Sequence, residues 1–197
     1  MKPNQAKSQQ RTLDWNSFEE FVNEFRDESD RASVILGAAK LDLVMYQILR
    51  EYLIAGPNST DELLDGDGPL GTFSAKINLL FRLGLVDAQF TRALHMVRKI
   101  RNAFAHEVKG CSLDSGSHCD RIKELVAPMK HLPFFKDFRT HFFNEKVGAS
   151  VDFRAGLAIM VGRLEALFEN VTPLSNSGAI EFVSPQWARD ASGEKSA

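Results

Sequence analysis

The apolar residues of this chain recur at the spacing of an α-helix over long segments, and this periodicity limits the fold more than any other feature. Between Ser29 and Ile54 they fall three, four or seven residues apart, whereas those of a strand alternate every second residue. Ser29 is a good N-cap residue and Gly56-Pro57 stops a helix, so one long helix is predicted here. Its small residues, which would let another helix approach closely, are Ala32, Ser33, Gly37, Ala38 and Ala39.

The same periodicity and the same stop signals predict helices along most of the chain. Residues 17–20 have the form of a capping box, Asp87 can cap a later helix, and Gly84 can end the one before it. Helices are expected over residues 17–25, 29–54, 72–84, 87–108, about 120–127, 133–143 and about 150–170, with a polar loop at 111–119.

These helices define an all-α protein, a helical bundle of about five to seven helices. Residues 14–171 are expected to form a single helical domain. Residues 1–13 are polar and are predicted to be a disordered N-terminal segment, and residues 172–197 a mostly irregular C-terminal tail.

The overall composition excludes several classes of protein. A net charge of −2 gives no global attraction to nucleic acid or acidic membranes, so polyanion binding would need a local patch. The polar start of the chain shows no secretory signal, and no apolar run approaches the ~20 residues that span a bilayer. We therefore expect a cytoplasmic protein without a membrane segment.

The sequence predicts neither a metal nor a cofactor. Cys111, His118, Cys119 and Asp120 are metal-binding residue types, but their spacing matches no zinc pattern. A disulfide between the two cysteines is disfavoured in a reducing cytosol.

The segment between Thr91 and Lys109 departs from the even balance of charge. It carries a single acid, Glu107, and five cations: Arg92, Arg98, Lys99, Arg101 and Lys109. Such a local basic cluster can contact a phosphate backbone, which makes Arg98 and Lys99 candidate ligand-binding residues. The alternative is a helix face that is merely solvated, and a charge run by itself favours that alternative.

The run Arg101-Asn-x-x-x-His106 lies within this segment and is the candidate catalytic set. Asn102 and His106 are four residues apart and share a helix face, with Arg101 one step round. An imidazole can transfer protons near neutrality and a guanidinium can hold a phosphate, so the set could cleave RNA without a metal if the ribose 2′-hydroxyl served as the nucleophile. The structural alternative, which spacing alone favours, has His106 bonded to a neighbouring helix and Arg101 in an internal ion pair.

Polar residues of the 29–54 helix can support this site. Asp30 and Asp42 are candidates to pair with Arg98 or Arg101 and hold them in place, and Arg31 is a further ligand-binding candidate. For Asp42 a buried structural ion pair is the favoured role. Either role requires contact between the second and fourth helices.

Lys76 is the last candidate ligand-binding residue. The preceding residues 71–74 resemble a helix N-terminus with small residues, which can hold an anion. The order of a phosphate-binding P-loop is absent, and plain helix capping by Thr72 or Ser74 is the favoured interpretation.

Three ordered motifs resemble the mannitol operon repressor family of bacteria: residues 28–32 with Leu41-Asp42, residues 69–77, and residues 98–106. The resemblance covers about residues 15–170 and implies negative control of transcription. Separately, the Arg-x4-His pattern of Arg101 and His106 resembles the signature of the HEPN superfamily of helical bundles. That resemblance implies a HEPN-like fold and a homodimer that brings two Arg/His pairs into one cleft, for RNA cleavage or for RNA binding only.

The sequence argues against direct, sequence-specific reading of DNA. The nearest candidate for a helix-turn-helix, residues 73–84 with 87–108, has an apolar turn at Leu85-Val86 and a second helix that is too long. We therefore expect negative regulation through a protein partner or RNA. The alternatives are a metal-independent endoribonuclease and a pure interaction module whose basic helix contacts an acidic partner.

Overall fold

The computed structural model describes residues 14–56, 60–107, 112–144 and 146–175. This part of the chain holds seven helices and no strand, which confirms the all-α class and the predicted number of helices. The predicted disordered segment 1–13 and most of the predicted tail lie outside the described residues. The helices are α1 (Trp15–Arg26), α2 (Asp30–Tyr52), α3 (Phe73–Arg82), α4 (Ala88–His106), α5 (Gly116–Val126), α6 (Pro133–Phe143) and α7 (Ala149–Asn170).

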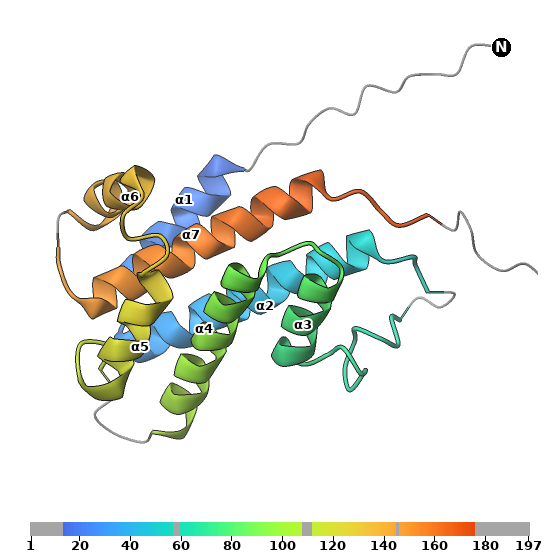
Figure 1. Cartoon of the computed structure of the whole chain (residues 1–197), viewed down its shortest axis with the longest axis horizontal. Coiled ribbons are helices and arrows are strands. Elements are labelled where there is room, and N and C mark those ends of the chain that lie inside the picture. Colours follow the sequence, from blue (N-terminus) through green and yellow to red (C-terminus); the bar gives the residue numbers. More distant parts are fainter. Residues whose placement is uncertain (1–13, 57–59, 108–111, 145, 176–197) are drawn as a thin grey trace, which may run out of the picture.

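The bundle is built around α2 and α7, which lie side by side and run in the same direction (Figure 1). The helices α3 and α4 pack on α2, whereas α5 and α6 pack on α7, and α1 contacts α2, α6 and α7. At the far end of the pair the backbone N–H of Leu174 donates to the carbonyl of Tyr52 at 2.8 Å. The predicted contact between the second and fourth helices is confirmed.

Gly37 allows α2 to approach α7 closely. A Cβ atom added to Gly37 would lie 2.6 Å from Cδ1 of Leu157 and 3.1 Å from the ring of Phe25. Both of these side chains are fully buried in the core, so neither can move aside freely.

The predicted helix starts are confirmed where a capping side chain could be recognised. Ser29 Oγ accepts from the N–H of Ala32 at 3.2 Å, Thr72 Oγ1 from that of Ala75 at 3.1 Å. Asp87 Oδ1 accepts from the N–H of Phe90 at 2.7 Å.

Two of the predicted starts are wrong. The cap of α1 is Asp14 rather than Ser17, because the Asp14 carboxylate accepts from the backbone N–H of Ser17 at 3.4 Å and the helix has begun by Trp15. The helix α5 begins at Gly116, inside the predicted loop 111–119. His118 is buried there against the ring of Phe104, and this packing favours helix where the local sequence is polar.

By length and composition α2 is apolar enough to cross a membrane, with a mean hydropathy of 1.5 over an 18-residue window. Half of that window is buried inside the protein, as expected for a core helix of the bundle. The other half includes large apolar side chains that face outward: Ile35, Leu36 and Leu43.

Candidate functional site

The candidate site lies along α4, whose two faces differ sharply. Leu94, Val97, Ile100 and Phe104 are fully buried and anchor the helix in the core. The opposite face carries polar residues spaced three and four apart, which places them in one line. We call this line the α4 stripe; its members are Arg92, His95, Lys99, Asn102 and His106.

Two of the predicted catalytic residues, Asn102 and His106, lie at the C-terminal end of the α4 stripe, and Arg101 lies one residue before Asn102. Arg101 and His106 are exposed and Asn102 is half-buried. The guanidinium of Arg101 donates to Oδ1 of Asn102 at 3.1 Å, so the amide holds the guanidinium across the helix surface. His106 is the last residue of the helix, one turn beyond Asn102. Arg101 and Asn102 are therefore positioned together, and an exposed imidazole lies one turn beyond Asn102.

The C-terminal end of α4 is held by Arg31 from α2. Its guanidinium donates to the carbonyl of Phe104 at 2.7 Å and also to the carbonyl of Glu107. The last carbonyls of a helix lack the N–H partners of the helix interior, and a cation next to them also interacts favourably with the helix dipole. Arg31 thus fixes the end of the helix that carries His106, and ligand binding by Arg31 itself stays a prediction.

A second imidazole lies beneath the same end of α4. His118 on α5 is buried, with its ring centroid 4.7 Å from that of Phe104 and Nε2 3.3 Å from Oε1 of Glu107. From the sequence, His118 was considered only as a possible metal ligand in a predicted loop. Its position beside a helix end could not be inferred, because the helical start of α5 was missed.

The middle of the α4 stripe is partly desolvated. Nε2 of His95 donates to Oδ1 of Asn78 on α3 at 3.1 Å. Burial of the His95 ring, with the nearby charges of Arg98 and Lys99, lowers the pKa of His95 below its ordinary value of 6.5. The imidazole is therefore neutral at pH 7, and the cations of the site are Arg92, Arg98, Lys99 and Arg101.

Lys76 and Asp42 form an ion pair away from the α4 stripe. Nζ of Lys76 lies 3.0 Å from Oδ1 of Asp42 and donates to the carbonyl of Gly71 at 3.2 Å. Lys76 is buried, whereas the Asp42 side chain is 37% exposed. The expected pairing of Asp42 with Arg98 or Arg101 is wrong, because Asp42 faces α3. The geometry supports the other expectation for Asp42, a structural ion pair. Anion binding by Lys76 stays a prediction.

Asp30 is likewise paired with a different cation from those expected. Its carboxylate accepts from Nη1 of Arg154 at 3.1 Å, from the hydroxyl of Ser150 at 2.6 Å and from the N–H of Leu113 at 2.8 Å. Burial raises the pKa of Asp30, but these three hydrogen bonds outweigh it and hold the pKa below its ordinary value. Arg154 was not among the residues predicted from the sequence. The signal that could have identified it is an arginine in an otherwise apolar stretch of the last helix.

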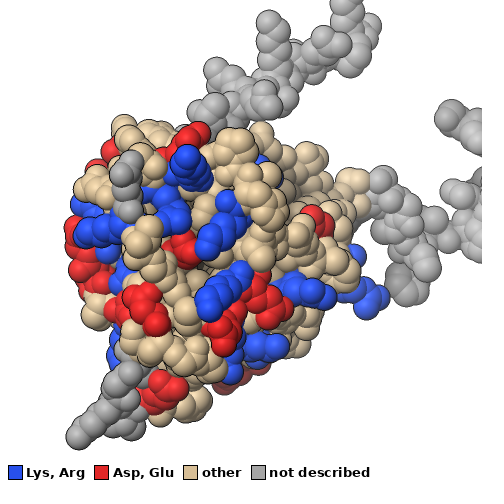
Figure 2. Space-filling model, turned by 60° about the vertical axis from the view of Figure 1, so that its left-hand side comes forward, with Lys and Arg blue, Asp and Glu red and all other residues tan. Residues whose placement is uncertain are grey.

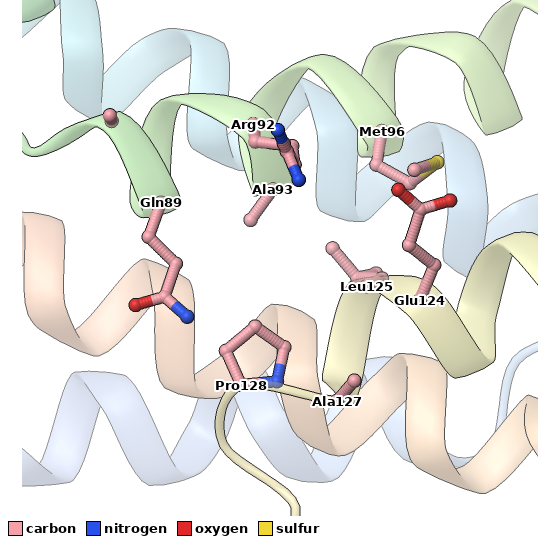
Figure 3. Close-up of a pocket in the computed structure, with 9 residues that line it drawn as sticks. Gln89, Arg92, Ala93, Met96, Glu124, Leu125, Ala127 and Pro128 are labelled. Atoms are coloured by element: carbon pink, nitrogen blue, oxygen red, sulfur yellow. The ribbon is translucent and has the colours of Figure 1, made fainter.

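A pocket of about 430 Å³ lies beside the first half of the α4 stripe, between α4 and α5 (Figure 3). Its floor is apolar, and Arg92 from α4 and Glu124 from α5 stand at its mouth (Figure 3). None of its lining residues is aromatic: Ala88, Gln89, Arg92, Ala93, Met96, Glu124, Leu125, Ala127 and Pro128.

Charges of both signs alternate over the neighbouring surface. On the face shown in Figure 2, Lys and Arg are interleaved with Asp and Glu and form no continuous basic field. Within the described residues, no three of His, Cys, Asp and Glu come together in a way that could hold a metal ion. The chemistry of the site therefore depends on side-chain charge, hydrogen bonding and an apolar pocket.

Fold and site together define an all-helical protein with a charged stripe and an adjoining apolar pocket on one helix. A family model described as "Mannitol repressor" matches residues 23–144, and the chain belongs to this family. This confirms the family resemblance, whereas the HEPN likeness stays a prediction.

Two relatives and one solved structure are similar to the chain. The mannitol operon repressors of Escherichia coli K12 and of E. coli O6:H1 are each 30% identical to the chain over 67 residues, 34% of each chain's length. The match thus spans about a third of these relatives. The X-ray structure of the MtlR–HPr complex from E. coli has a TM-score of 0.56 at 19% identity, covering 76% of this chain and 99% of that one. At this identity the likeness shows the fold alone.

Proposed function

We propose that this chain is a negative regulator of transcription that acts by binding a protein partner on α4. The observation that carries the proposal is the apolar pocket beside Arg92, with Lys99 further along the α4 stripe. Such a site suits a protein surface that inserts one apolar side chain while its acidic groups meet Arg92 and Lys99. Single-stranded nucleic acid sites instead use aromatic side chains for base stacking, and this pocket has none.

The partner we propose is a protein of the HPr type. The protein of similar fold was solved in a complex with HPr, and the family is shown by the matched residues 23–144. Among the described helices, α3 and α4 form the nearest approach to a helix-turn-helix, but α4 has 19 residues and the turn before it contains the apolar Leu85 and Val86. Neither feature is typical of a helix-turn-helix that reads DNA.

Calorimetric titration of the purified chain with E. coli HPr tests this proposal. We expect saturable binding that weakens about tenfold or more in Arg92→Ala and in Met96→Glu, because one loses a cation and the other blocks the pocket. Lys123→Ala, which removes an exposed cation elsewhere on α5, is the matched control and should bind normally. Unchanged binding in both α4 variants would move the interface elsewhere, and no binding by wild type would remove HPr as partner.

A second candidate function is metal-independent RNA cleavage, and the observation that favours it is the exposure of His106 one turn beyond Asn102, the residue that accepts a hydrogen bond from Arg101. In this function His106 transfers the proton, Arg101 binds the phosphate, and a homodimer brings two such sets together. Labelled structured RNA is incubated with wild type and His106→Ala in chelator. Cleavage by wild type only supports this function, and intact RNA in both reactions rejects it.

A further inference from the structure

The outer face of α2 carries an apolar line that the described helices leave uncovered. Ile35, Leu36 and Leu43 are 37%, 45% and 50% exposed. Residues on the opposite face of the helix, such as Leu41 and Ile48, are fully buried. We call the exposed line the outer stripe of α2; its members are Ala32, Ile35, Leu36, Ala39 and Leu43.

Ion pairs on both sides mark where the outer stripe ends. Lys40 turns toward α7, where its Nζ lies 2.7 Å from Glu165. Asp42 turns toward α3 and pairs with Lys76. The outer stripe lies between these two flanks, so it is a surface bounded by charge rather than a gap in the core.

The spacing of the outer stripe is that of a helix–helix seam. Residues 32, 36, 39 and 43 follow one another at intervals of four, three and four, the repeat that keeps one line facing a partner helix. Alanine and leucine alternate at these positions, so a partner helix can approach closely at the alanines and be packed by the leucines.

The geometry points to a second copy of this chain as the partner: we propose that two α2 helices pack antiparallel about a twofold axis at Ala39. In this register Leu43 of one chain packs on the partner's Ile35 and the partner's Leu36, and Ala39 meets the partner's Ala39. Arg50, exposed in the last turn of α2, then lies opposite the partner's Glu28, exposed just before its first turn. The pairing is thus complementary in shape and charge, and the antiparallel helix dipoles also attract.

This arrangement goes beyond the proposed binding of HPr, and it is a different dimer from the one in which the second candidate function joins two Arg/His sets. It also separates the two α4 sites, because Arg31 marks the end of α2 that holds His106. Arg31 is eight residues from Ala39, so the two copies of Arg31 lie about 24 Å apart along the helix axis at ~1.5 Å per residue. The dimer therefore contains two independent sites and no composite Arg/His cleft.

One helix pair buries less than the ~800 Å² per chain of a standard interface, so we expect a dimer that dissociates at micromolar concentration. Sedimentation equilibrium of the full chain from about 1 to 100 μM measures it directly. The double variant Leu36→Glu with Leu43→Glu should weaken the dimer about 100-fold or more, since it places four carboxylates in the seam. Val147→Glu, at an 83% exposed apolar residue outside α2, is the control and should leave the dimer unchanged.

Cysteine cross-linking tests the register without disturbing the seam by charge. With both native cysteines changed to serine, Ala39→Cys should form an intermolecular disulfide on oxidation, because residue 39 lies on the twofold axis. Leu43→Cys should not, since residue 43 faces the partner's Ile35. Cross-linking of Leu43→Cys but not of Ala39→Cys would overturn the antiparallel register.

Three results would overturn the assignment of this face: a monomer at every concentration, a dimer unaffected by the double variant, or a monomer that binds phosphatidylglycerol vesicles through the outer stripe. Titration of the double variant with HPr separates this inference from the proposed function. If the double variant is monomeric and still binds HPr, both the α2 dimer and the HPr proposal are supported. If wild type does not bind HPr, the HPr proposal fails and the sedimentation result still tests the dimer.

Discussion

The carboxylate of Asp30 and the guanidinium of Arg154 lie 3.1 Å apart and join the first turn of α2 to the first turns of α7, 124 residues further along the chain. The same guanidinium donates to the carbonyl of Glu28 at 2.7 Å, and Ser150 completes the cluster. The two central helices are therefore fixed at their starting ends by a buried, charged set of hydrogen bonds.

Removing Asp30 should destabilise the protein strongly. Asp30→Ala leaves the Arg154 guanidinium buried without its carboxylate, and we expect a loss of about 3 kcal/mol in the free energy of unfolding, measured by urea denaturation. The matched control is Asp120→Ala, which breaks an exposed pair with Lys123 and should cost much less, because solvent screens that pair. Equal losses in the two variants would contradict the role assigned to Asp30.

The Lys76–Asp42 pair should respond unequally to the loss of each partner. Asp42→Ala strands a buried ammonium and should cost about 3 kcal/mol. Lys76→Met fills the same space with an apolar chain and leaves Asp42 partly hydrated, so the expected loss is below ~1.5 kcal/mol. Chemical denaturation of both variants measures which one loses more free energy of unfolding. A larger loss in Lys76→Met would contradict this expectation and would show that the ion pair itself stabilises α3.

Gly37→Ala should destabilise the contact between α2 and α7. The new methyl group would meet Leu157 at 2.6 Å, and overpacking of this kind costs about 1–3 kcal/mol. Helix propensity alone predicts the opposite sign, a gain of about 1 kcal/mol. Thermal unfolding measures the difference, with Gly56→Ala, which meets nothing within 4 Å, as the control.

His95 should make the protein less stable as the pH falls below 6.5. The pKa of His95 is lowered in the folded state, so the unfolded chain binds the proton more tightly. As the pH falls from 6.5 to the folded pKa, protonation therefore stabilises the unfolded state and the free energy of unfolding decreases. His95→Asn should flatten this decline in a pH series of denaturation curves. The exposed His131, changed to Asn, is the control; parallel curves for wild type and His95→Asn would rule the effect out.

The helices were predictable from the chain itself wherever the signal was local. Ser29, Thr72 and Asp87 cap their helices as expected, because a capping side chain acts on N–H groups only a few residues away. The start of α5 was not predictable, since it depends on the burial of His118 against Phe104 on another helix.

The candidate site was predictable in its residues but not in its surroundings. The spacing of Asn102 and His106 placed them on one face, as the helix requires. The partners of Asp30 and Asp42 were wrong, because a carboxylate on a helix can reach any cation that the topology brings near. The pocket beside Arg92 involves α5, whose extent the sequence understated.

The burial of the first two-thirds of α7 divides the chain into regions with different tolerance to sequence drift. Ten residues of α7 between Asp152 and Leu164 are buried, so a substitution there changes how many molecules are folded rather than what a folded molecule recognises. The outward faces of α2 and α4 have the reverse property, because exposed positions can vary while the fold survives. In this protein new binding specificities can therefore arise on α2 and α4, while substitutions in α7 are selected mainly for their effect on the amount of folded protein.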